Sequence, residues 1–284
     1  MAEATLHIGG HGVHLCGGDT VERALHIPGM KVFEVRNSEF EIPSMEVRLD
    51  RVVTLPDCRW LHEFRILDGQ QTCRFGVDAE RTYYYTFDRH GVLRYREGEG
   101  VDIDMQDNME ALRFALWTAY AMMGVRLGAA PVHSSVVVCE GKAVMCLGES
   151  GTGKSTHTRL WLENIAGTHL LNDDSPIVSL VGDEVRVFGS PWSGKSDCYL
   201  QESYPIAGLL RLEQRKENTI RRLGVVESFT ALQPSCPPSL AKDELCMDLL
   251  VEYISKVIER VPVYRMGCLP DADAARLSHK TIIG

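Results

Sequence analysis

The sequence predicts a mixed α/β protein, with a small β-rich N-terminal domain over residues 1–104 and a domain of mixed strands and helices over residues 105–284. Short β-type runs separated by turn signals fill residues 31–96, and helical and strand patterns alternate after residue 105. One apolar strand of this second part runs through a glycine-rich loop straight into a helix. The first 25 or so residues are rich in glycine, so we expect them to be flexible.

The N-terminal domain is predicted from six β-type runs. Turn signals such as Asp68-Gly69 and His90-Gly91 separate these runs, which favours a small and mostly antiparallel sheet. A polar stretch then leads to a predicted helix over residues 109–127, with Asp107 or Asn108 as its cap and apolar residues at helical spacing on its core side. The six runs cover residues 31–36, 44–52, 62–67, 72–77, 81–88 and 91–96.

The second domain is predicted from a mixture of strands and helices. Residues 133–147 resemble a hairpin around a Glu-Gly-Lys turn, and residues 155–165 a helix that stops at Gly167. Later elements are a strand ending at Asp174, a hairpin over residues 177–189, a long amphipathic helix over 242–260, a strand over 261–268 and a final helix after Pro270. The apolar face of the long helix is predicted to hold Leu245, Leu249, Tyr253, Ile254, Val257 and Ile258.

The composition limits the classes of partner. The chain has 284 residues, 44% of them apolar, which is enough for a sizeable core. Its net charge of -9 argues against nucleic acid or an anionic membrane as the main partner, because both repel an acidic surface. No basic segment with a following apolar run begins the chain, and no run of about 18 apolar residues occurs in it. We therefore expect a cytoplasmic protein.

The nine cysteines form no C-x-x-C pair, and several lie in apolar runs, as expected for buried thiols in a reducing compartment. An alternative is a metal site made by His7, His11, His14 and Cys16. We disfavour it because the intervening glycines indicate a flexible terminus rather than a preorganised tetrahedron.

Two stretches, Gly148 to Ser155 and Gly189 to Ser196, match the pattern G-x-x-x-x-G-K-[ST]. The first lies between a strand and a helix, so its amides and the helix N-terminus can bind phosphate, with Lys154 along the phosphates and the Ser155 hydroxyl on Mg²⁺. It predicts a binding site for ATP or another nucleoside di- or triphosphate. The residues expected to bind the nucleotide are Gly148, Glu149, Ser150, Gly151, Thr152, Gly153, Lys154, Ser155 and Thr156.

The second stretch lacks this context, because Pro191 and Trp192 lie inside it and no amphipathic helix begins at Ser196. It therefore indicates a surface loop. Lys195 in this loop is a candidate catalytic cation for phosphate charge that develops during transfer, and a solvated loop lysine is the alternative.

An acidic pair, Asp173 and Asp174, ends a short strand only 18 residues after Ser155. This spacing predicts that the strand next to the phosphate-loop strand brings both carboxylates to the phosphate end. Adjacent residues on a strand point in opposite directions, so one carboxylate can face the metal and the other the acceptor.

Residues 133–195 resemble the nucleotide-binding core that HPr kinase/phosphorylase (a bacterial protein-serine kinase) shares with phosphoenolpyruvate carboxykinase. The matching pieces are His133, "GESGTGKST", "NDD" and the hairpin that follows them. The likeness covers residues 130–200 well and the remaining C-terminal part loosely, and it hardly extends to the N-terminal domain. It implies a P-loop kinase core, ATP with Mg²⁺, and a homo-oligomer. By position, it implies that Ser155 and Asp174 bind the metal, that Asp173 is the general base, and that His133 lies near the reacting groups. The opposite order of the two aspartates and a purely structural His133 stay open.

The chain differs from both families in two ways that reduce the number of activities to consider. The chain is about half as long as a carboxykinase and lacks a recognisable set of residues for oxaloacetate, so decarboxylation is disfavoured. The segment that HPr kinase uses for phosphorolysis and protein docking is not recognisable either. A basic patch in this part is suited to an acidic substrate, although a salt-bridged surface is the favoured interpretation; it consists of Arg211, Arg215, Lys216, Arg221 and Arg222.

The sequence thus predicts a Mg²⁺- and ATP-dependent kinase that transfers a phosphoryl group to a hydroxyl of a small molecule or of a protein serine. The alternatives are a nucleotide-binding regulatory module with little turnover and a scaffold that has kept the fold without catalysis. No residue pattern identifies the acceptor.

Overall fold

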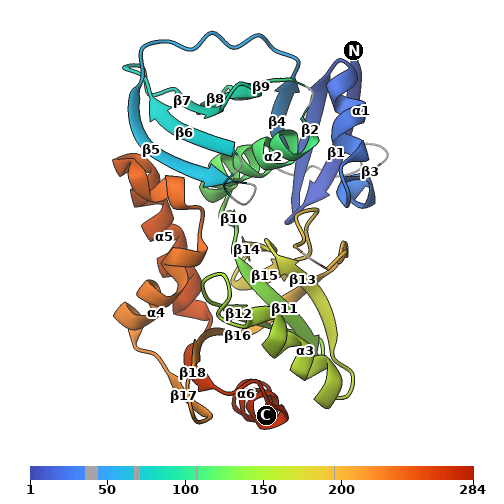
Figure 1. Cartoon of the computed structure of the whole chain (residues 1–284), viewed down its shortest axis with the longest axis vertical. Helices are drawn as coiled ribbons and strands as arrows, with labels where there is room; N and C mark the ends of the chain where they lie inside the picture. Colours follow the sequence, from blue (N-terminus) through green and yellow to red (C-terminus); the bar gives the residue numbers. More distant parts are fainter. Residues whose placement is uncertain (36–43, 67–68, 70, 107, 195) are drawn as a thin grey trace. The chain divides into compact units, whose positions relative to one another are not determined.

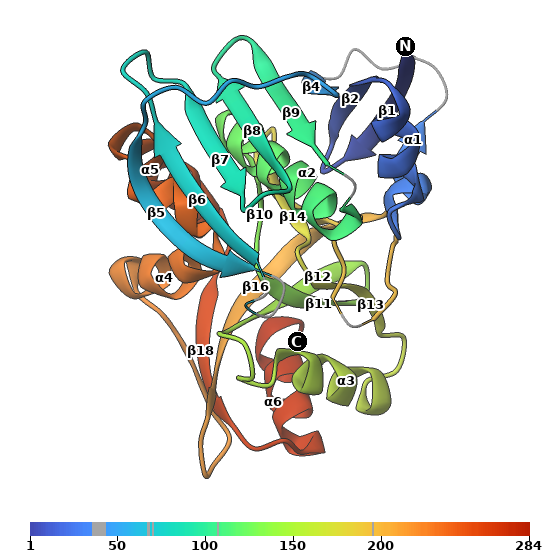
Figure 2. The ribbon, with the colours of Figure 1, turned by 45° about the horizontal axis from the view of Figure 1, so that its top comes forward.

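The computed structural model describes residues 1–35, 44–66, 69, 71–106, 108–194 and 196–284 (Figures 1 and 2). The protein is mixed α/β, and the described residues form two nine-stranded sheets. It divides into two compact units: unit 1 comprises Met1–Leu127 and Ser239–Asp248, and unit 2 comprises Gly128–Pro238 and Leu249–Gly284. The division expected after residue 104 differs from this one because helix α2 (Met109–Gly124) packs on the sheet of unit 1.

The sheet of unit 1 has the strand order β3-β1-β2-β4-β9-β8-β7-β6-β5. Its pairs are antiparallel except for β2 with β4 and β4 with β9, which confirms a mostly antiparallel sheet. The strands are β1 (Ala2–Ile8), β2 (His11–Gly17), β3 (Glu34–Val35), β4 (Ser44–Leu49), β5 (Arg59–Ile66), β6 (Gln71–Val77), β7 (Tyr83–Phe87), β8 (Gly91–Arg96) and β9 (Gly100–Met105).

The N-terminal segment, expected to be flexible, forms β1, β2 and helix α1 (Asp19–His26). Strands β1 and β2 pair from Ala2 with Gly17 to Ile8 with His11, so the glycines lie in and around a hairpin. Burial of alternate residues, among them Leu6 and Leu15, fixes this hairpin in the sheet. A short 3₁₀ helix, η1 (Met30–Phe33), follows and leads into β3.

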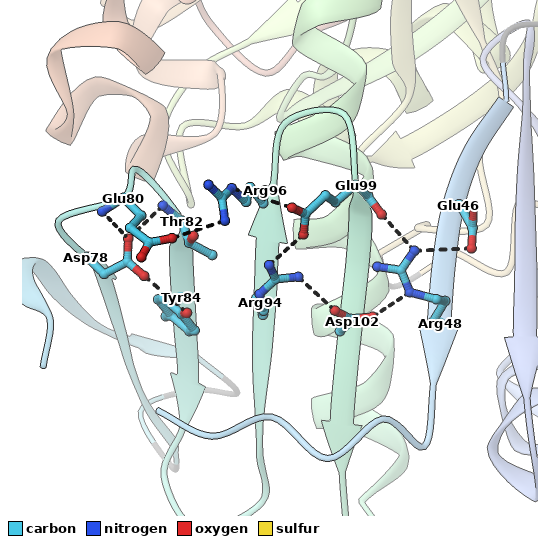
Figure 3. Close-up of polar contacts among 10 residues, drawn as sticks. All are labelled: Glu46, Arg48, Asp78, Glu80, Thr82, Tyr84, Arg94, Arg96, Glu99 and Asp102. Atoms are coloured by element: carbon cyan, nitrogen blue, oxygen red, sulfur yellow. Dashed lines mark hydrogen bonds and ion pairs between the residues drawn. The ribbon is translucent and has the colours of Figure 1, made fainter. Parts of the chain in front are cut away.

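Strand β9 (Gly100–Met105) lies in the polar stretch that precedes the predicted helix over residues 109–127. Its apolar residues Val101 and Ile103 are buried, while Asp102 between them lies on the other face. On that face Asp102 accepts hydrogen bonds from Arg48 Nε at 2.6 Å and Arg94 Nη1 at 3.0 Å (Figure 3). The acidic residues that give this stretch its polar character therefore belong to a charged sheet face.

Helix α2 confirms the predicted apolar stripe, since Leu112, Ala115 and Ala119 are buried. The side chain of Asn108 caps it by accepting a 2.9 Å hydrogen bond from the amide of Ala111. Asp107, the other candidate cap, lies outside the described residues. The helix continues into the 3₁₀ turn η2 (Val125–Leu127), which completes the predicted range.

A second piece of chain, Ser239–Asp248, belongs to unit 1. Asp243 fastens it there: its buried carboxylate accepts hydrogen bonds from Tyr83 Oη at 2.9 Å and Arg81 Nη1 at 3.2 Å. This attachment joins residues 160 positions apart. No short-range sequence pattern indicates such a contact.

The sheet of unit 2 has the order β10-β14-β15-β16-β12-β11-β13, with β18 paired to β16 and β17 to β18. The hairpin β11–β12 turns at Glu140 and Gly141, and the hairpin β14–β15 follows β13, as predicted. The strands are β10 (Ala129–Pro131), β11 (Ser134–Cys139), β12 (Lys142–Leu147), β13 (His169–Asp174), β14 (Ile177–Val181), β15 (Glu184–Phe188), β16 (Ser203–Gln214), β17 (Thr219–Arg222) and β18 (Val263–Cys268).

The remaining helices of the described residues are α3 (Lys154–Asn164), α4 (Val225–Leu232), α5 (Glu244–Arg260) and α6 (Ala272–Ile282), with the 3₁₀ turns η3 (Gln233–Ser235) and η4 (Pro238–Lys242). In unit 2, α3 and α6 lie side by side (Figures 1 and 2), and Trp161 of α3 is fully buried there. Helices α3, α5 and α6 were predicted. The predicted apolar face of α5 is wrong at Leu245, which is exposed, whereas Cys246 and Leu250 are buried.

Among the described residues, none of the helices combines the length and the apolar character that crossing a membrane requires.

Candidate active site

The first G-x-x-x-x-G-K-S stretch joins strand β12 to helix α3, as predicted. Gly151 and Gly153 have φ angles of 79° and 107°, in the left-handed region that side chains disfavour. Thr152 closes the turn, because its amide and hydroxyl both donate to the carbonyl of Glu149. The glycines are therefore required by the loop conformation, which ends at the N-terminus of α3.

Lys154, the first residue of α3, turns back over this loop. Its Nζ donates to the carbonyl oxygens of Gly148 at 2.8 Å and Glu149 at 3.2 Å, and it lies 2.9 Å from His133 Nε2. Burial lowers the pKa of Lys154 from its ordinary value, and the charge of Asp174 opposes that shift. A cation is thus held at the start of the loop, only 9% exposed.

His133 connects Lys154 to the acidic pair. Its Nδ1 lies 3.1 Å from Oδ1 of Asp174, and its Nε2 faces Lys154. A neutral imidazole with its proton on Nδ1 satisfies both contacts, donating to the carboxylate and accepting from the ammonium. His133 therefore contacts both Lys154 and Asp174, and its place near the reacting groups stays a prediction.

Asp173 has different partners from Asp174, as expected of neighbours on a strand. Its Oδ1 accepts a 2.9 Å hydrogen bond from Ser155 Oγ, and its Oδ2 accepts a 3.2 Å hydrogen bond from Ser196 Oγ. The carboxylate thus links the phosphate loop to the second G-x-x-x-x-G-K-S stretch.

The order of the strands explains how the acidic pair reaches the loop. The expectation that β13 lies next to the loop strand β12 is wrong, because β11 lies between them. Since β11 is antiparallel to both, β12 and β13 run in the same direction and end at the same edge of the sheet. The two aspartates and the loop therefore meet although their strands are not neighbours.

The second stretch is a loop with no helix after it among the described residues, as predicted. The predicted surface position is wrong for most of it, because Ser190, Trp192 and Ser193 are buried. It is built onto residues 172–175: Asn172 Nδ2 donates to the Ser190 hydroxyl at 3.2 Å, and Ser190 Oγ donates to the Ser175 carbonyl at 2.6 Å. A Cβ on Gly194 would lie 2.6 Å from the carbonyl oxygen of Asp173, so only glycine allows the loop this close. Lys195, the candidate second cation, lies outside the described residues.

Three residues near the loop were not predicted as site residues. Ser196 is one, and its place at the end of the second motif was a usable signal. The others lie on β16: Gln214 Nε2 donates to the carbonyl of Gly151 at 3.2 Å, and Arg211 lies 3.8 Å from the carboxylate of Glu149. Because β16 itself was not predicted, nothing in the sequence connected Gln214 to the loop.

A hollow of about 360 Å³ opens beside the phosphate loop. Its lining includes Gly153, Thr156 and Leu160 of the loop and α3, Gln214 of β16, and Pro270. Its volume lies within the range of small-ligand sites, and its mixed lining suits a nucleoside next to bound phosphates.

The basic patch is largely salt-bridged, as predicted. Arg215 pairs with Glu213 at 2.8 Å, and Arg221 pairs with Glu227 at 2.6 Å. Arg215, Lys216 and Arg221 also line a second hollow, of about 950 Å³, together with acidic residues. The arginines are therefore not a uniform positive surface.

The residues at the loop fit a nucleotide with Mg²⁺. Left-handed glycines, a buried ammonium and a helix N-terminus suit phosphate oxygens. The exposed Ser155 hydroxyl and two carboxylates form a donor set of oxygen atoms only, which is the kind that Mg²⁺ prefers.

All nine cysteines are free. In the part of the chain that the structure describes, three potential metal ligands approach one another within 4.8 Å at Cys139, Glu140 and His279. None of the N-terminal histidines belongs to that group.

Comparison with known proteins finds a likeness in structure only. The HPr(Ser) kinase/phosphatase from Coxiella burnetii matches with a TM-score of 0.32 and 12% identity, over 54% of this chain and 93% of that one. No model of a known protein family matches the chain. No curated protein matches its sequence.

Proposed function

We propose that unit 2 binds a nucleoside triphosphate with Mg²⁺ and transfers its γ-phosphoryl group to a hydroxyl. The observation that carries the proposal is the convergence of Lys154, Ser155 and both aspartates at one edge of the sheet. His133 joins Lys154 to Asp174 by contacts of 2.9 and 3.1 Å, and Ser155 donates to Asp173 at 2.9 Å. A loop that served only as a turn has no need of a buried ammonium and two carboxylates around it.

Each residue has a distinct role in this proposal. The loop amides and Lys154 bind the phosphates, and Ser155 with Asp174 holds the metal, which supplies charge neutralisation for phosphoryl transfer. Asp173 accepts the proton of the attacking hydroxyl. We choose Asp173 because its Oδ2 accepts a hydrogen bond from the hydroxyl of Ser196, which lies outside the phosphate loop. His133 fixes Asp174 and Lys154 relative to each other.

The test is to incubate the full chain with Mg²⁺-ATP and to measure nucleotide binding by calorimetry and ADP release by a coupled assay. The acceptors to compare are small hydroxyl compounds and serine-containing peptides. Binding with acceptor-dependent ADP release supports the kinase. Binding without any release supports a regulatory nucleotide module, and no binding at millimolar nucleotide excludes both.

A further inference from the structure

The two G-x-x-x-x-G-K-S stretches end in serines that share one carboxylate. Ser155 Oγ donates to Oδ1 of Asp173 at 2.9 Å, and Ser196 Oγ donates to Oδ2 at 3.2 Å. Before it loses its proton, the hydroxyl of a phosphoryl acceptor lies within hydrogen-bond distance of the general base. Ser196 therefore occupies an acceptor's position relative to Asp173.

The described residues next to Ser196 are held against β13. Ser193 Oγ donates to the Ser196 carbonyl at 2.6 Å, and the amide of Ser175 donates to the Trp192 carbonyl at 3.1 Å. Gly194 brings the backbone against the carbonyl of Asp173, within a distance that no side chain allows. The half-buried Ser196 is thus positioned by the same strand that carries the base.

We infer that Ser196 is a phosphorylation site of the protein's own kinase centre, modified within the same chain. This inference rests on the proposed function. Asp173 takes the hydroxyl proton, and Ser196 Oγ forms a bond to the γ-phosphorus of the nucleoside triphosphate. The bond from that phosphorus to the β–γ bridging oxygen breaks, and the nucleoside diphosphate leaves with the electron pair.

Phosphorylation of Ser196 is expected to slow further phosphoryl transfer by the same site. A phosphate on Ser196 brings a charge of roughly -1.5 to -2 next to Asp173 and removes the hydroxyl proton that now binds Oδ2. One phosphoryl group per chain is therefore expected, and the phosphorylated chain is expected to transfer more slowly to any added acceptor.

The experiment treats the purified full chain with Mg²⁺ and γ-labelled ATP, and locates the label by peptide mass spectrometry. Nucleotide binding is measured in parallel by calorimetry. We expect phosphoserine at position 196 with a rate constant independent of protein concentration. Label is lost in Ser196→Ala, appears as phosphothreonine in Ser196→Thr, and falls about 100-fold or more in Asp173→Asn. Ser203→Ala, which removes a hydroxyl lying near Arg186 instead, is the matched control and keeps the label.

The other outcomes separate the two proposals. Nucleotide binding and transfer to an added hydroxyl without label on Ser196 overturn the inference and leave the proposed function intact. Label on another residue, or a rate that rises with protein concentration, also overturns it. Absence of nucleotide binding removes the proposed function and the inference with it.

Discussion

Ser155 Oγ donates a 2.9 Å hydrogen bond to Oδ1 of Asp173, and this contact joins the phosphate loop to the acidic strand. The two residues are 18 positions apart: Ser155 lies in the first turn of helix α3, and Asp173 lies near the end of β13. The contact exists because β12 and β13 run in the same direction and end at the same edge of the sheet. The predictions for the site depend on this convergence.

Replacing Lys154 by Ala is expected to weaken nucleotide binding. A charged hydrogen bond to phosphate contributes about 2–3 kcal/mol, which corresponds to an affinity roughly 30- to 150-fold weaker. Calorimetric titration with Mg²⁺-ATP measures the change. Lys142→Ala, an exposed lysine at the start of β12, is the control and should bind as the wild type does. Equal affinities in both variants would contradict the assignment of Lys154.

The two aspartates are expected to respond differently to replacement by Asn. Asp173→Asn should lower phosphoryl transfer about 100-fold or more while nucleotide binding persists, because the general base is lost. Asp174→Asn should raise the Mg²⁺ concentration needed for half-maximal transfer, because an oxygen ligand loses its charge. Initial rates over a Mg²⁺ series distinguish these effects. The reverse pattern would assign the base to Asp174.

Gly194→Ala tests whether the second loop must approach β13 closely. The added Cβ would lie 2.6 Å from the carbonyl oxygen of Asp173, so the loop has to move, at a cost of about 1–3 kcal/mol. We expect a lower melting temperature and less label on Ser196. Gly12→Ala is the control, because its nearest contact would be an ordinary 4.0 Å. An unchanged melting temperature and unchanged labelling of Ser196 would show that the loop does not need to approach the carbonyl of Asp173 closely.

The charged face of unit 1 predicts a pH-dependent stability. Burial raises the pKa of Asp102, but the hydrogen bonds and charges of Arg48 and Arg94 outweigh this and leave the pKa below its ordinary value (Figure 3). Because the folded-state pKa is the lower one, the stabilisation is complete above about pH 4 and is lost as the pH falls through the folded value.

Asp102→Asn is therefore expected to destabilise the protein by about 1–3 kcal/mol at pH 7 and by progressively less in acid. Urea unfolding over a pH series measures the difference from the wild type. The matched control is Glu80→Gln, which removes an exposed partner of Arg96 at 3.2 Å and should change stability by less than about 0.5 kcal/mol. A difference that stays constant down to pH 2 would exclude the linkage.

Local patterns were sufficient for several elements. Apolar spacing predicted α2 and α5, and the strand–glycine loop–helix order predicted the phosphate loop, because these signals depend on residues a few positions apart. Strand β9 was missed because its Asp102 forms ion pairs with Arg48 and Arg94 across the sheet face, whereas its apolar residues face the core. Strand β16 was not predicted from the sequence, so the contact of Gln214 with Gly151 could not be anticipated.

The sequence by itself was sufficient to locate the phosphate loop, its Lys154 and Ser155, and the acidic pair. Each of these features consists of residues that are consecutive in the chain, so a local pattern identifies it. Only the tertiary structure decided which aspartate meets Ser155 and that Ser196 shares its carboxylate. Those contacts depend on strand order and on the close approach of Gly194 to β13, and both are set by packing between residues that are distant along the chain.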